Sequence, residues 1–234
     1  DDFIQYTYDF SWDNNPPFTS LEFALSATVL YLISVWLLPK YMENREPFSL
    51  KSIRIVHNFL LCVFSLTSLV AVVYYWGKIL LTPGWGWQAV VCDVDRVQER
   101  HSPLAFWYYL FYLSKFYEFI DTLILIMRKK PIIFLHWYHH FTTVWVSFIP
   151  MWDRHAILWI TIMLNATIHT FMYFYYLSVT MGWNTWWKKY LTRLQIIQFI
   201  LDIGINCVWY SYENYYNMDC AGSNSIFWFG QAVL

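Results

Sequence analysis

Three histidines share one face of an apolar segment just after the middle of the chain. His136, His139 and His140 fall within an arc of roughly 100° if the segment is helical, because each helical residue advances by about 100°. The flanking side chains are apolar, and ionisable rings that cluster on one face of such a segment usually line an interior site. This face therefore offers three imidazoles for proton transfer, nucleophilic attack or metal binding.

Metal binding is the first chemistry that this spacing suggests. The His-x-x-His-His pattern at 136–140 resembles one box of the membrane di-iron desaturases and hydroxylases, which use several such boxes. The chain has seven histidines and no second box. We therefore expect no metal at this site, with a mononuclear site as the alternative, because neutral imidazole binds metals readily.

Acyl transfer is the second chemistry. A neutral imidazole can accept a proton, or it can attack an activated acyl group to give an acyl-imidazole that a second nucleophile resolves. A carboxylate such as Asp121 would fix the tautomer of one ring, following the logic of a catalytic triad. If the activated acyl chain lies among membrane helices, a thioester is the expected substrate. The cationic segments 128–130 and 188–193 suit a carrier that bears phosphates.

The composition places these residues in a membrane protein. Hydrophobic residues make up 58% of the 234 positions and charged residues only 13%, whereas soluble domains carry about 45–50% apolar and about 25% charged residues. The net charge of −1 gives no sign of nucleic-acid binding. The sequence shows no internal repeat or linker, so we expect residues 1–234 to form a single all-α, polytopic domain in the lipid bilayer.

Apolar runs predict seven membrane helices, each needing about 20 residues. Six complete spans are expected at Leu21–Leu38, Ile55–Trp76, Leu104–Met127, Ile132–Pro150, Ala156–Thr180 and Leu194–Tyr212. A seventh run begins at Ser225 and is cut off at Leu234, so we expect this last helix to be truncated.

Lysine and arginine in the connections predict the orientation. The connections after the first, third and fifth spans hold ten of these residues, and those after the second, fourth and sixth hold four. The positive-inside bias then places the first set in the cytosol, the N-terminus in a lumen, and the C-terminus in the cytosol. The three-histidine face lies near the cytosolic end of the fourth span.

Two of the four cysteines, Cys92 and Cys220, fall in connections assigned to the lumenal side, where disulfides can form. They predict a bridge between the connection after the second span and the connection after the sixth. Two free thiols are the alternative, because sequence alone does not test the geometry.

Polar residues recur on one side of several spans. In the third span Lys115, Glu118 and Asp121 form a stripe, in which Lys115 can neutralise Glu118. At about 1.5 Å per residue, the polar groups of four spans lie in the cytosolic half or near the midplane. We therefore expect a buried polar pocket that opens to the cytosol and continues as an apolar tunnel. Isolated polar residues such as His57 and Asn206 are interpreted first as links between helices.

Four consecutive stretches carry a family resemblance. They are residues 115–122 (KFYEFIDT), 136–140 (HWYHH), 169–176 (HTFMYFYY) and 192–198 (TRLQIIQ), each beginning in or next to an expected span. Together and in this order they resemble the signature motifs of the ELO family of very-long-chain fatty acid elongases, over nearly the whole chain.

The resemblance implies a 3-oxoacyl-CoA synthase of the endoplasmic reticulum membrane. Such an enzyme condenses a long-chain acyl-CoA with malonyl-CoA and releases CoA and carbon dioxide without a cofactor. In this family six helices surround an acyl tunnel, and separate reductases and a dehydratase process the product; a homodimer is an open alternative to a monomer. A metal-dependent lipid desaturase or hydroxylase, and less so a seven-helix transporter or receptor, are the other functions considered.

The resemblance and the chemistry of the side chains together suggest catalytic and substrate-binding roles for the polar residues. We expect His139 to accept the acyl group, with a general-base role as the alternative. We expect His169 to face it and to polarise a thioester or help malonyl-CoA lose carbon dioxide, with His136, His140 and Asp121 orienting the pair. Cations expected to bind CoA phosphates are Lys115, Arg128, Lys188 and Arg193. The rest of the expected substrate-binding set is Glu118, Asn165, Met172, Tyr173, Tyr176, Gln195 and Gln198.

Overall fold

The computed structural model describes residues 2–100 and 103–233, and over these residues it contains helices and connections with no strand. The all-α prediction is therefore confirmed. One 3-10 turn lies at Trp12–Asn14. The α-helices are α1 Asp2–Tyr8, α2 Leu21–Met42, α3 Lys51–Leu81, α4 Gly86–Val91, α5 Val97–Arg100, α6 Leu104–Tyr117, α7 Phe119–Met127, α8 Phe134–Trp152, α9 Leu158–Met181, α10 Lys188–Asn214 and α11 Asn224–Val233.

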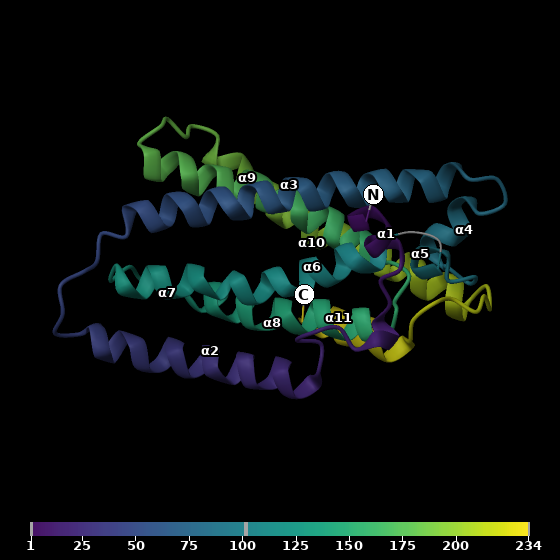
Figure 1. Ribbon diagram of the computed structural model, residues 1–234, viewed down its shortest axis with the longest axis horizontal. Helices are drawn as coiled ribbons and strands as arrows, with labels where there is room; N and C mark the ends of the chain where they lie inside the picture. The colour runs from purple at the N-terminus through teal and green to yellow at the C-terminus, as the bar shows by residue number, and fades with distance from the viewer. Residues whose placement is uncertain (1, 101–102, 234) are drawn as a thin grey trace.

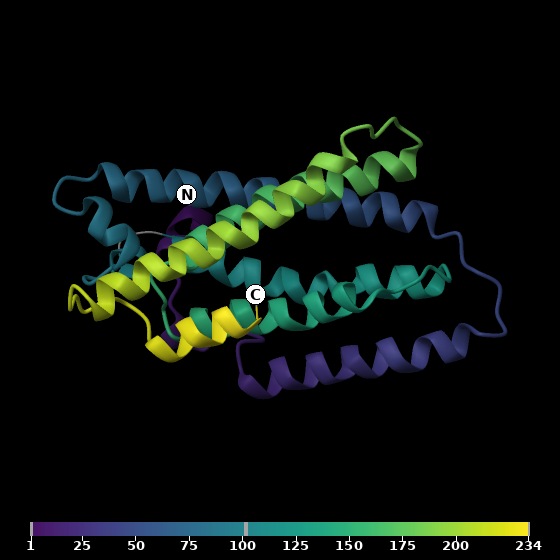
Figure 2. The same ribbon diagram turned by 180° about the vertical axis from the view of Figure 1, so that it is seen from behind.

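The long helices form one elongated bundle. Figure 1 shows α3 beside α9 along one edge, α7 and α8 in the middle, and α2 along the opposite edge. Figure 2, from behind, shows α10 crossing the bundle at an angle while it packs on α9. The shorter α11 contacts both α8 and α10.

The connections gather at two opposite ends of this bundle. One end, which we call the basic end, carries the connections 43–50, 128–133 and 182–187 (Figure 1). The other, the disulfide end, carries α4, α5 and the connections 153–157 and 215–223. The sequence grouped the connections in the same two sets. The compartment that each end faces stays a prediction.

Three helices are long and apolar enough to cross a membrane, among those the structure describes: α2, α3 and α10. The expectation of seven spans is therefore not confirmed by length and composition, and it stays a prediction. The third expected span is interrupted. Glu118 separates α6 from α7, and a tight hydrogen bond of 3.0 Å runs from the Asp121 amide to the Glu118 carbonyl, three residues apart.

The helices extend beyond their apolar cores. α3 begins at Lys51, four residues before the expected start at Ile55. The difference arises because hydropathy marks the apolar part of a helix and not the limits of its hydrogen bonding. α10 likewise begins at Lys188 instead of Leu194. The extra turn of α3 includes Arg54, which therefore belongs to a helix and not to a connection.

An aromatic core fills the half of the bundle nearer the disulfide end. Trp76 of α3 stacks on Trp159 of α9 with ring centroids 3.6 Å apart, and Tyr112 of α6 lies against Phe148 of α8 at 5.6 Å. Such close-packed aromatic rings contribute strongly to the stability of a core. The acyl tunnel expected in this half is not confirmed, and it stays a prediction.

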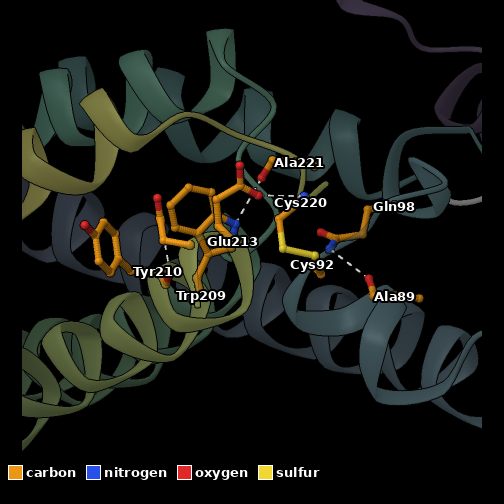
Figure 3. Close-up of a disulfide and its surroundings, with 9 residues drawn as sticks. Ala89, Cys92, Gln98, Trp209, Tyr210, Glu213, Cys220 and Ala221 are labelled. Atoms are coloured by element: carbon orange, nitrogen blue, oxygen red, sulfur yellow. Dashed lines mark hydrogen bonds between the residues drawn. A yellow bond between two sulfur atoms is a disulfide. The ribbon is translucent and has the colours of Figure 1, made fainter. Parts of the chain in front are cut away.

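A disulfide joins Cys92 and Cys220, the pairing that the sequence predicts, with Cα atoms 4.4 Å apart (Figure 3). Two further bonds fix the junction. The Ala221 amide donates to the Cys92 carbonyl at 2.7 Å, and the Trp209 indole N–H donates to the Ala221 carbonyl at 3.2 Å. The bridge therefore ties the segment after α4 to the connection between α10 and α11.

Replacing Cys220 with serine should lower the free energy of unfolding by about 2–4 kcal/mol, because the bridge closes a long loop in the unfolded chain. The two cysteines are 128 residues apart in sequence. Thermal unfolding of detergent-solubilised protein measures the change. Serine at the free and exposed Cys207 is the matched control, and an equal shift for both variants would contradict the prediction.

His155 should make the disulfide end sensitive to acid. It is 4% exposed, its ring lies 4.2 Å from that of Trp209, and burial lowers its pKa to about 4. In the unfolded chain the pKa of histidine is about 6.5. As pH falls, the unfolded chain therefore binds the proton before the folded protein does, and stability decreases between pH of about 6.5 and about 4. Above about 6.5 both states are neutral and the effect vanishes.

The measurement is the unfolding temperature of wild type and His155→Asn between these two pH values. The wild type should lose on the order of 2–3 kcal/mol more than the variant over this window. Burial also raises the pKa of the neighbouring Asp153. Because Asp153 is present in both proteins, its effect cancels in the comparison. Parallel pH curves for the two proteins would contradict the assignment to His155.

Candidate active site

A cavity of about 460 Å³ lies between α3, α7, α8, α9 and α10, in the part of the bundle toward the basic end. Its wall brings together eleven of the residues predicted from sequence. They are Asp121, Arg128, His136, His139, His140, Asn165, His169, Met172, Tyr176, Gln195 and Gln198. Residues from separate sequence motifs therefore meet around one space.

The three-histidine face lies in the first two turns of α8. Lys129 adopts a left-handed backbone with φ of 52°, and Pro131 follows, so α7 ends and the chain turns back into α8. The His136 ring lies 4.7 Å from the His140 ring, and the His139 ring lies 5.6 Å from it. Over residues 2–100 and 103–233, no group of three or more histidine, cysteine, aspartate or glutamate side chains is arranged to hold a metal ion.

His169 of α9 lies against a buried ion pair. Its Nδ1 is 3.4 Å from Glu118 Oε1, and the same carboxylate oxygen accepts a 2.7 Å hydrogen bond from Lys115 Nζ. Lys115 also donates to Asn165 Oδ1 at 3.1 Å. Glu118 thus orients the His169 ring and leaves Nε2 as its remaining polar atom, an arrangement that resembles the carboxylate and histidine of a triad.

Asp121 has different partners from those expected. Its Oδ1 lies 2.8 Å from His57 Nε2, and its Oδ2 accepts a 2.7 Å hydrogen bond from the Tyr173 hydroxyl. His136 Nε2 instead lies 3.1 Å from Thr122 Oγ1. These contacts do not show the expected role of Asp121 in orienting His139 and His169, and that role stays a prediction. Asp121 follows Glu118 by three residues, and the sequence did not show which carboxylate faces which ring.

Several predicted substrate contacts lie off the cavity wall. Lys115 and Glu118 are only 1% and 2% exposed and satisfy each other, so Lys115 is not placed to meet a phosphate. Tyr173 is fully buried behind the wall, with its hydroxyl on Asp121. Lys188 and Arg193 are exposed at the start of α10 and do not line the cavity.

The first two turns of α3 form a wall that sequence reasoning missed. Arg54, His57 and Asn58 all line the cavity. The sequence favours a link between helices for His57, and it places Arg54 just before the expected start of the span at Ile55. The available signal was their spacing, because residues three and four apart share one helix face. Recognising it required knowing that the helix begins before its apolar core.

The fold and this site define an all-helical integral membrane protein with a cavity lined by histidines and by Asp121. The chain belongs to the ELO family: the model described as "GNS1/SUR4 family" matches residues 16–234.

Relatives carry elongase names. The chain is 40% identical to a putative fatty acid elongase of Dictyostelium discoideum over 79% of its own length and 61% of the relative's. It is 37% identical to fatty acid elongase sre1 of the same organism, over 89% of this chain and 77% of the relative. Fatty acid elongase A of that organism is 35% identical, over 92% of this chain and 78% of the relative. The chain thus spans less than two thirds of the first relative and somewhat more of the other two.

Proposed function

We propose that this protein performs the condensing step of fatty acid elongation, in which a long-chain acyl-CoA and malonyl-CoA give a 3-oxoacyl-CoA, CoA and carbon dioxide. The observation that carries the proposal is that His139 of α8 and His169 of α9 line the same cavity. Glu118 Oε1 lies 3.4 Å from His169 Nδ1. The elongase names of the relatives support it. The apolar helices around the cavity suit an acyl tail.

In the first half-reaction His139 is the acyl acceptor. Its neutral imidazole attacks the thioester carbon, the carbon–sulfur bond breaks, and protonated His169 gives its proton to the departing CoA sulfur. The products are CoA, neutral His169 and a cationic acyl-imidazole on His139. Glu118 orients His169 for this transfer, because its carboxylate oxygen lies 3.4 Å from Nδ1 and leaves Nε2 as the atom that carries the transferred proton.

In the second half-reaction malonyl-CoA loses carbon dioxide. The electron pair of the broken carbon–carbon bond forms the thioester enolate, whose carbon attacks the acyl group and releases His139 as neutral imidazole. His169 then takes a proton from water. One proton is consumed in each turnover, as the overall condensation requires.

The topology and cell biology belong to the same proposal. The basic end faces the cytosol, where acyl-CoA and malonyl-CoA are available, the N-terminus is lumenal, and the membrane is that of the endoplasmic reticulum. Ten lysine and arginine residues in the connections of this end and in the adjoining helix turns support the orientation. The product then passes to the reductases and the dehydratase of the elongation cycle.

The test supplies purified protein with radiolabelled malonyl-CoA and a panel of acyl-CoAs of increasing length. We expect labelled 3-oxoacyl-CoA two carbons longer than the acceptor, together with CoA and carbon dioxide. Malonyl-CoA alone and acyl-CoA alone are the controls. Carbon dioxide release without carbon–carbon bond formation, or no product with any acceptor, would contradict the proposal.

A further inference from the structure

Two guanidinium groups line the cavity where it approaches the basic end. Arg54 extends from the first turn of α3, and Arg128 follows the last turn of α7. Neither forms an ion pair with a carboxylate among residues 2–100 and 103–233. Two like charges held in one cavity without acidic partners provide a complementary site for an anionic ligand.

Arg54 is held in place by α9. Its Nη2 donates a 2.7 Å hydrogen bond to Thr180 Oγ1, and the Thr180 hydroxyl in turn donates to the Tyr176 carbonyl at 2.7 Å. The hydroxyl proton is therefore used on the helix, and the oxygen is left to accept from Arg54. A guanidinium has five N–H donors in a planar fork, so those not used on Thr180 stay available for a ligand.

The distance from Arg54 to the reacting histidine fits a carrier arm. Thr180 follows His169 by eleven residues on α9, which is about 16 Å along a helix that rises about 1.5 Å per residue. In a CoA thioester about thirteen bonds separate the sulfur from the nearest phosphorus. Extended, these bonds span about 16 Å, at roughly 3.6 Å for every three chain bonds.

We propose that Arg54, with Arg128 beside it in the cavity, binds the diphosphate that joins pantetheine to adenosine in the CoA substrates. The inference rests on the proposed function, because it takes the substrates to be CoA thioesters with their sulfur near His169. Arg54 anchors the carrier equally in the bound substrate and in the transition state, so it contributes to binding of the thioester. The 3′-phosphate, farther along the carrier, lies beyond its reach.

The experiment compares wild type and Arg54→Gln with four acyl donors that lose phosphates in order: acyl-CoA, its 3′-dephospho form, acyl-phosphopantetheine and acyl-pantetheine. The variant should raise KM at least about tenfold for the first three donors with little change in kcat, because charge-assisted bonds to a phosphate are lost. With acyl-pantetheine, wild type and variant should have the same KM.

Lys51→Gln is the matched control, since Lys51 is exposed one turn earlier on α3 and does not line the cavity. It should leave all four KM values within about twofold. Arg54→Lys, which keeps the charge and loses the planar fork, should recover part of the lost affinity. An equal effect of Lys51→Gln, or a defect of Arg54→Gln that persists with acyl-pantetheine, would overturn the assignment.

A defect that disappears when only the 3′-phosphate is removed would also overturn it, because the contact would then be with that group. Direct binding of CoA and of pantetheine separates this inference from the proposed function. If wild type makes no elongated product but binds CoA more tightly than pantetheine, and Arg54→Gln removes that preference, the phosphate site stands and the condensation does not. Equal binding of CoA and pantetheine by wild type would overturn the phosphate site.

Discussion

Replacing His139 with alanine should abolish acyl transfer. The acyl-imidazole cannot form without this ring, and loss of a covalent nucleophile lowers kcat by about 10⁴-fold to 10⁶-fold. Wild-type protein incubated with acyl-CoA alone should release CoA and gain the mass of one acyl group on His139, whereas His139→Ala should do neither. Intact-protein mass spectrometry and a thiol assay for CoA measure the two products.

Two variants sharpen this test. His155→Asn changes a histidine at the opposite end of the bundle, and at neutral pH it should keep full acyl labelling for each folded molecule. His169→Gln keeps the nucleophile and removes the proton donor of the leaving CoA, so it should slow acylation by about 10²-fold to 10⁴-fold without moving the adduct. An adduct on His169 in wild type, or no adduct in the presence of full elongation activity, would contradict the assigned roles.

The sequence predicted two features of the structure, one within a single helix and one that follows from the topology. The spacing of His136, His139 and His140 fixes a common face whatever surrounds it, because the angular step of a helix is constant. The two cysteines follow from the grouping of connections at two ends of the bundle. The structure places both features as expected, since neither depends on how the helices rotate about their own axes.

The features that depend on helix rotation and crossing were not predictable in the same way. Lys115, Glu118 and Asp121 form one stripe in sequence, yet the first two face a buried junction with His169 while Asp121 reaches the cavity wall between His57 and Tyr173. A break at Glu118 separates these environments. A helical stripe spans an arc, and only the neighbouring helices decide which part of that arc meets the cavity.

Removing one partner of the buried pair between Lys115 and Glu118 should strongly destabilise the protein. The two side chains are 1% and 2% exposed and their charged atoms are 2.7 Å apart. Lys115→Met leaves the Glu118 carboxylate without its cation in an apolar interior, which costs about 3–5 kcal/mol for a pair of this kind. The expected result is a large fall in unfolding temperature, measured in detergent together with the yield of folded protein.

The double variant Lys115→Met with Glu118→Gln separates structure from catalysis. Both charges are then absent, so stability should return to within about 1–2 kcal/mol of wild type, because replacing a buried pair as a whole is often nearly neutral. Activity should not return. Without the carboxylate beside Nδ1, the His169 ring loses the group that orients it, and acylation should stay about 10²-fold or more below wild type.

Stability and activity of the double variant together distinguish two roles of Glu118. If Glu118 only balanced Lys115, a double variant that folds normally would also elongate normally, because nothing in the acyl-accepting residue His139 has changed. If Glu118 also orients the His169 ring, the refolded double variant stays slow, because His169 no longer holds Nε2 in place for proton transfer to the leaving CoA. A stable double variant with wild-type activity would confine Glu118 to a structural role.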